Sequence, residues 1–189
     1  MLVNCQKFLI LGISKSGYSA CDYLLKNNCI CYIYEEHNSP SIKSRLDDLI
    51  SRGAIFVTKE GVDEVLRYVD VLVVSPGVPI NHEVPIKAKG RNIKIISELE
   101  FGFNCLMPII VGVTGTNGKT TTVSLIDAII KEGGKNSFAV GNIGCPVTQR
   151  VDEITSKSIC VTEISSFQLE STLNFRPDVL NVVVPIFSS

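Results

Sequence analysis

The feature that most constrains the fold is a glycine-rich loop placed between an apolar run and a helix-like segment. Residues 112–121 read Gly-Val-Thr-Gly-Thr-Asn-Gly-Lys-Thr-Thr and overlap the end of the run Ile109 to Val113. Glycines permit a tight curve in which consecutive N–H groups and a helix N-terminus converge on phosphate oxygens. The lysine supplies a positive charge, and the threonine after it supplies a hydroxyl for a magnesium ion. The loop therefore predicts binding of a nucleoside triphosphate.

The loop is a variant of the strict pattern G-x-x-x-x-G-K-[ST], which would place glycine at position 113, where this chain has valine. The alternative is a glycine turn with a solvated lysine, but such a turn gives little reason for Gly-Lys-Thr-Thr at the start of a helix. The residues predicted to bind the nucleotide are Gly115, Thr116, Asn117, Gly118, Lys119, Thr120 and Thr121.

Short apolar runs alternate with helix-like segments along the chain, which is typical of βαβ units and parallel sheets. Strands are expected at 7–11, 29–34, 54–57, 69–74, 93–96, 109–113, 137–140, 159–162 and 179–184. Helices are expected at 18–26, 41–52, 97–104, 119–131 and 165–173. We therefore predict an α/β protein. Residues 1–106 would form a Rossmann-like parallel-sheet domain, and residues 107–189 an incomplete α/β domain of P-loop type.

Composition excludes several function classes. The formal net charge of −1 gives no electrostatic basis for binding nucleic acid or an anionic membrane. No apolar stretch approaches the roughly 20 residues of a membrane span, and the N-terminus lacks a signal-peptide pattern. The seven cysteines are scattered and odd in number, and with two histidines they form no zinc-ligand spacing. Reduced core thiols in a cytoplasmic protein are expected.

Weaker motifs follow the expected strands of the first half. Residues 12–17, Gly-Ile-Ser-Lys-Ser-Gly, differ from the dinucleotide pattern G-x-G-x-x-G by Ser14 in place of the second glycine. That glycine lets the backbone approach a pyrophosphate closely, so a nicotinamide-dependent oxidoreductase is disfavoured. Glu35 follows the second strand, where such folds place an acidic residue against a ribose, although a solvated charged loop explains it equally well. The turn Ser75-Pro76-Gly77 ends a later strand on the ligand side of the sheet.

Several motifs in order carry a family resemblance. Residues 113–121 (V-T-G-T-N-G-K-T-T) resemble the nucleotide loop of the Mur ligase family. Residues 141–144 (G-N-I-G) and 163–170 (E-I-S-S-F-Q-L-E) resemble its D-glutamate-adding members in particular. Residues 12–17, 74–79 and 97–101 are similar to the same family, so that the resemblance runs from about residue 7 to residue 182.

The resemblance implies an ATP-dependent and magnesium-dependent amide-forming ligase of peptidoglycan synthesis. It would phosphorylate the carboxylate of UDP-N-acetylmuramoyl-L-alanine and pass the acyl group to D-glutamate, as a monomer in the cytoplasm. Lys119 and Asn142 would act in catalysis, and Thr120 and Glu163 would hold magnesium; taken alone, Glu163 could equally be a capping or surface carboxylate. The residues implied in substrate binding are Ser16, Gly17, Glu35, Ser75, Pro76, Gly77, Asn142 and Ser165.

The C-terminal residues depart from the family. After Asn181-Val182 an aspartate-histidine pair is expected, but this chain reads Val-Val-Pro-Ile-Phe-Ser-Ser at 183–189. Without that pair, a later lysine and the C-terminal domain that binds D-glutamate, the chain alone is not expected to complete the reaction. A frameshifted or decaying reading frame is one interpretation, and a deliberately shortened chain is another. The alternative function is a non-catalytic module that binds the UDP-sugar and the nucleotide.

Overall fold

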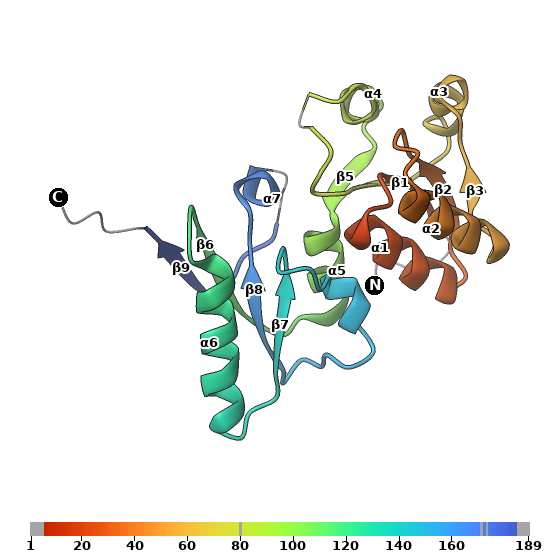
Figure 1. Ribbon diagram of the computed structural model, residues 1–189. Coiled ribbons are helices and arrows are strands. Elements are labelled where there is room, and N and C mark those ends of the chain that lie inside the picture. The colour runs from red at the N-terminus through yellow and green to blue at the C-terminus, as the bar shows by residue number, and fades with distance from the viewer. Residues whose placement is uncertain (1–5, 80, 171, 173, 185–189) are drawn as a thin grey trace.

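The computed structural model describes residues 6–184 apart from 80, 171 and 173. Two parallel sheets follow one another along the chain (Figure 1). The first sheet has the order β3-β2-β1-β4-β5 and the second has the order β7-β8-β6-β9. The α/β fold class with parallel sheets is confirmed.

The first unit contains five strands and the helices between and after them. Its strands are β1 (Lys7–Leu11), β2 (Ile30–Tyr34), β3 (Ile55–Phe56), β4 (Val71–Val74) and β5 (Lys94–Ser97). Its helices are α1 (Lys15–Lys26), α2 (Pro40–Ser51), the 3₁₀ turn η1 (Lys59–Gly61), α3 (Val62–Val65), α4 (Glu83–Gly90) and α5 (Glu98–Leu106).

The central strand β1 is buried on both faces, as expected for a parallel sheet covered by helices. Phe8 and Ile10 point into a core that α1, α2 and α5 complete. Leu9 and Leu11 point into the opposite core, which α3 and α4 cover. The carboxyl ends of β1, β2 and β4 therefore meet at one edge of the sheet, where the loops can form a site.

The second unit carries the glycine-rich loop between a strand and a long helix. Its elements are β6 (Ile109–Gly115), α6 (Lys119–Glu132), β7 (Ser137–Gly141), the 3₁₀ turn η2 (Val147–Arg150), β8 (Ile159–Glu163), α7 (Ser166–Glu170) and β9 (Val179–Val183). Val123 of α6 packs on Val113 and Val161 on one face of the sheet. On the other face, Leu99 and Phe103 of α5 join the core.

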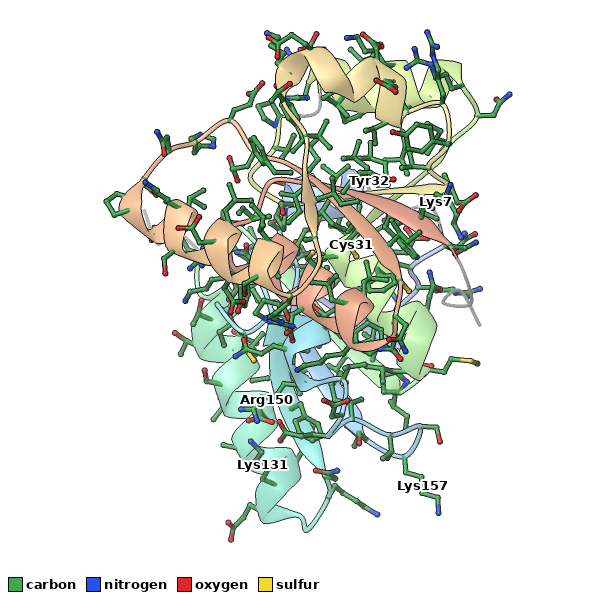
Figure 2. All side chains as sticks on the ribbon, turned by 90° about the vertical axis from the view of Figure 1, so that its right-hand side faces the viewer. Lys7, Cys31, Tyr32, Lys131, Arg150 and Lys157 are labelled. Carbon is green, nitrogen blue, oxygen red and sulfur yellow. The ribbon has the colours of Figure 1, made fainter. Side chains whose placement is uncertain are left out.

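Helix α5 connects the two units because it contributes to both cores. Phe101 packs into the first core, where its ring meets that of Phe8 with centroids 6.0 Å apart. Leu99 and Phe103, on another side of the same helix, pack with Val147 of η2. Figure 2 shows the side chains around the labelled Cys31 and Tyr32 of the first unit, and Lys131, Arg150 and Lys157 of the second.

The strands lie close to their expected positions, and the helices show three differences. Helix α1 begins at Lys15, three residues before the expected start, with Ser14 at the N-cap position but without a side-chain cap. Helices α3 and α4 were not predicted, and neither was η2. The helix expected at 165–173 covers Ser166–Glu170, and residues 171 and 173 lie outside the described residues. The C-terminal segment 183–189, where the sequence departs from the family, lies outside the described residues from 185 onward.

In the described part of the chain, no helix is both long enough and apolar enough to cross a membrane.

Candidate nucleotide and substrate site

The glycine-rich loop connects β6 to α6 with two glycines in the left-handed region. Gly118 is the N-cap of α6 at φ 76°, and α6 has neither a side-chain cap nor an acidic residue in its first turn. Gly115, at φ 139°, packs against β9 so closely that a Cβ there would lie 2.0 Å from the carbonyl oxygen of Val183. The first N–H groups of α6 therefore remain available for a phosphate.

The ammonium group of Lys119 lies against the carbonyl groups of the same loop. Its Nζ donates to the carbonyl oxygen of Gly115 at 2.7 Å and to that of Thr116 at 3.3 Å. These bonds hold the positive charge beside the exposed residues Thr116, Asn117 and Gly118. A phosphate bound at the N-terminus of α6 would lie next to this charge.

Glu163 connects the loop to the G-N-I-G segment. Glu163, a residue that is 3% exposed, stands at the end of β8, the strand between β6 and β7. The hydroxyl of Thr120 donates to Oε2 of Glu163 at 2.6 Å, and Nδ2 of Asn142 donates to Oε1 at 2.9 Å. The structure thus brings together three residues that the sequence analysis assigned to magnesium and catalysis.

The oxygen atoms at this position fit a magnesium ion. Magnesium prefers oxygen ligands and keeps several waters, so one carboxylate, one hydroxyl and phosphate oxygens form a suitable set. Thr120 and Glu163 would hold the ion, because their oxygens lie in hydrogen-bond contact beside the phosphate loop. Among the described residues, no group of three or more histidine, cysteine, aspartate or glutamate side chains could hold a metal ion.

A second part of the site lies at the carboxyl ends of β1, β2 and β4. A cavity of about 400 Å³ is lined there by residues that include Glu35, Ser75 and Gly77. Ser75 is buried, and its hydroxyl donates to the carbonyl oxygen of Gly12 at 2.7 Å, which ties the two loops together. Gly17 lies beneath them, where a Cβ would come within 1.9 Å of the Gly12 carbonyl oxygen. The structure thus places Gly17 under the loop as a packing residue.

The carboxylate of Glu35 is engaged by backbone groups. Oε2 accepts from the N–H of Ile13 at 2.8 Å, and Oε1 accepts from the N–H of His37 at 2.8 Å. Burial alone would raise the pKa of Glu35, but these hydrogen bonds outweigh it, so that the pKa lies below its ordinary value. Glu35 is therefore an ionised residue that shapes the cavity rim, and not a solvated loop carboxylate.

A smaller cavity between the two units is lined by most of the remaining predicted residues. Its volume is about 290 Å³, and its lining includes Ser16, Pro76, Gly77 and Asn142. Ser165 is not brought to this cavity: its hydroxyl donates to Oε1 of Gln168 at 3.1 Å, at the start of α7. Sequence reasoning overlooked Lys15, which lines this cavity, although it stands within the glycine motif of residues 12–17.

Comparison with known proteins agrees with this geometry. Residues 6–97 match the family model of the Mur ligase MurD-like N-terminal domain, and residues 113–183 match that of the Mur ligase middle domain. The two parallel sheets, with the glycine-rich loop between β6 and α6, define an α/β protein with a Rossmann-like unit before the loop. The chain belongs to the Mur ligase family.

Within that family, the chain is similar to enzymes named UDP-N-acetylmuramoylalanine–D-glutamate ligase. It is 38% identical to that of Clostridioides difficile (strain 630) over 175 residues, which are 92% of this chain and 39% of the relative. It is 40% identical to that of Lachnoclostridium phytofermentans over 178 residues, 92% of this chain and 38% of the relative. The chain thus spans about two fifths of the length of these relatives.

A solved structure supports the fold. The UDP-N-acetylmuramate:L-alanyl-gamma-D-glutamyl-meso-diaminopimelate ligase from Neisseria meningitides matches with a TM-score of 0.60 at 16% identity, over 97% of this chain and 62% of that one. At this identity the match concerns the arrangement of helices and strands alone.

Proposed function

We propose that this chain carries the UDP-substrate and ATP parts of a ligase that adds D-glutamate to UDP-N-acetylmuramoyl-L-alanine. The observation that carries the proposal is the Glu163 carboxylate, which contacts Thr120 of the phosphate loop and Asn142 of the interunit cavity. The Glu163 carboxylate therefore lies between the proposed triphosphate site at the loop and the proposed site of a second ligand at the interunit cavity. The similarity to enzymes named D-glutamate ligases supports the UDP-linked substrate as that second ligand.

The proposed reaction joins two anionic reactants through an acyl phosphate, and the chain's residues serve to position them. Magnesium, when bound, would neutralise charge on the transferred phosphoryl group. Lys119 and the N–H groups of α6 would hold the triphosphate, while Asn142 would orient the end of the substrate beside it. Thr120 and Glu163 would fix the ion. No role in binding D-glutamate follows from the described residues.

We assign the substrate part to residues 1–106 and the nucleotide part to residues 107–189, with α5 packed into both cores. We also propose a monomer that works in the cytoplasm. Cys21, Cys31, Cys145 and Cys160 carry free thiols, as suits a reducing compartment. Light scattering of the purified chain would measure its mass in solution.

Calorimetric titration of the purified chain tests the function. We expect binding of UDP-N-acetylmuramoyl-L-alanine, and binding of ATP that is much tighter when magnesium is present. Glu163→Gln should weaken the magnesium-dependent binding of ATP by tenfold or more, because it removes the charge that holds the ion. A wild-type chain that binds no uridine nucleotide would contradict the proposal. Binding of both ligands without formation of an amide product would favour a binding module.

A further inference from the structure

Two residues of α5, Glu98 and Gly102, meet the turn η2 of the second unit. They lie about one helical turn apart and so share a face of the helix. Glu98 accepts hydrogen bonds from both the backbone N–H and the hydroxyl of Thr148. At Gly102 the helix comes so close to η2 that a Cβ would lie 2.7 Å from Cγ1 and 2.8 Å from Cβ of Val147. We call these four residues the α5–η2 joint.

The glycine at position 102 serves the joint and not the helix. Gly102 lies inside α5 and is not among the glycines with positive φ. Glycine is less favourable than alanine in a helix interior, so α5 itself gives no reason for it. The close approach of Val147 does, because a side chain branched at Cβ cannot turn aside from a new methyl group.

The joint adjoins one wall of the 290 Å³ cavity between the units. That wall includes Asn142 and Pro146, and Pro146 directly precedes Val147 of the joint. The N–H of Gly141 donates to the carbonyl oxygen of Cys145 at 2.8 Å, which closes residues 141–145 into a turn. A displacement of Val147 is therefore passed on toward Asn142, because the connecting segment is short and held at both ends.

The opposite wall is tied to the same joint through α1. This wall includes Ser16, in the first turn of α1. Ser19 follows in the same helix, and its hydroxyl lies within hydrogen-bond distance of the Thr148 hydroxyl. Ser19, Glu98 and Thr148 are all buried. The joint thus fixes the helix that begins at one wall against the turn that follows the other.

We propose that Glu98 and Gly102 are positioning residues, which set the width of the interunit cavity and so hold Asn142 at the end of the substrate bound in the first unit. The inference rests on the proposed function for the identity of the substrate. Neither residue lines this cavity, so both act through η2. A ligand confined to one unit does not depend on the joint, whereas a ligand that spans the cavity does.

The test compares Gly102→Ala with Gly90→Ala, the same change at a position where a Cβ meets no atom within 4 Å. Each chain is titrated with UDP, with UDP-N-acetylmuramoyl-L-alanine and with magnesium-ATP. The wild type should bind the full substrate more tightly than UDP. We expect Gly102→Ala to reduce that preference by about tenfold, the scale of one lost hydrogen bond. Its affinities for UDP and magnesium-ATP should not change, which also verifies that both units are folded. Gly90→Ala should match the wild type.

Two further comparisons separate positioning from a loss of stability. Thr148→Val removes the hydroxyl from the joint and should also reduce the preference for the full substrate, whereas Thr148→Ser should retain it. In an Asn142→Ala background, which already lacks the contact with the substrate, Gly102→Ala should cause no further loss. The effects of these two changes should therefore not be additive.

Three results would overturn the inference while leaving the proposed function intact. One is an unchanged preference for the full substrate in both Gly102→Ala and Thr148→Val. Another is a loss that adds to that of Asn142→Ala, because the joint would then act elsewhere. The third is a wild type that binds UDP and the full substrate equally, because nothing beyond the first unit would then hold the substrate. A wild-type chain that binds no uridine nucleotide would instead remove the proposed function on which the inference rests.

Discussion

The carboxylate of Glu98 accepts two hydrogen bonds from Thr148, one from its backbone N–H at 2.9 Å and one from its hydroxyl at 2.7 Å. The same hydroxyl lies 2.9 Å from the Oγ of Ser19. These side chains are buried and belong to α5, η2 and α1 respectively. The other oxygen of Glu98, Oε2, is also buried and has no partner. The contact between the two units thus includes a carboxyl group with one oxygen satisfied and one free to carry a proton.

Stability should depend on the protonation of Glu98. Burial raises the pKa of Glu98 to about 7, against the smaller opposite effect of the bonds from Thr148. The folded chain therefore keeps a proton that the unfolded chain releases near the ordinary value of 4.5. This contribution to the free energy of unfolding is complete below that value and is lost as the pH rises through about 7.

Glu98→Gln should remove this pH dependence, because the amide keeps a carbonyl oxygen for Thr148 and never ionises. We expect the variant and the wild type to unfold at similar urea concentrations at pH 5. At pH 8 the variant should be more stable, by up to roughly 3 kcal/mol. Urea titrations at both pH values measure the difference. If both proteins lost the same stability between the two values, Glu98 would not be the titrating group.

Thr148→Val should weaken the contact between the units, because it removes the hydroxyl that reaches both Glu98 and Ser19. The backbone N–H of Thr148 still donates to Glu98, so we expect a loss of about 1–2 kcal/mol of unfolding free energy. Thr148→Ser keeps the hydroxyl and should lose much less. Urea unfolding of the two variants at pH 6 checks this, and equal losses would show that the methyl group, and not the hydroxyl, carries the effect.

Thr120→Val should lower the affinity for magnesium-ATP by about tenfold or more, since valine offers neither a ligand for the ion nor a donor for Glu163. Thr120→Ser supplies both and should bind nearly as the wild type does. Titration with and without magnesium separates the effect on the ion from that on the triphosphate. An equal loss in the absence of magnesium would contradict a role at the metal.

Gly17→Ala should destabilise the first unit by more than about 3 kcal/mol or displace α1, because the new Cβ would lie 1.9 Å from the Gly12 carbonyl oxygen. Gly90→Ala is the matched control. A Cβ at Gly90, the last residue of α4, meets no atom within 4 Å, so this change should be neutral or slightly stabilising. Thermal unfolding followed by circular dichroism compares them, and equal midpoints would show that α1 accommodates the methyl group.

The strands were predictable because each central strand is a short apolar run, as a sheet covered on both faces requires. Helix α4 was not predictable from the sequence, since it follows a turn cluster and includes Pro85, a residue that usually breaks helices. The structure places Pro85 in the first turn, where a missing N–H has no cost. The early start of α1 was also missed, because Lys15, Ser16 and Gly17 belong to a glycine motif that is typical of a loop.

The candidate site was predictable where the chemistry is local to one motif, as in the phosphate loop. Contacts between segments that lie far apart in the sequence were less predictable. The sequence suggested roles for Asn142 and Glu163 through a resemblance, but their hydrogen bond depends on the pairing of β7 with β8. The contact between Glu98 and Thr148 joins residues 50 positions apart and leaves no periodic signal. Glu98 therefore looked like an ordinary acidic residue at a helix start.

The position of Glu163 also has a thermodynamic consequence for the proposed ligase. One carboxylate contacts Thr120 with one oxygen and Asn142 with the other, so a ligand that reorients it at either side alters the contacts on the opposite side. The free energies of binding of nucleotide and substrate are then not additive. Whatever factor the first ligand imposes on the affinity of the second, the second imposes on the first, because both paths lead to the same ternary complex.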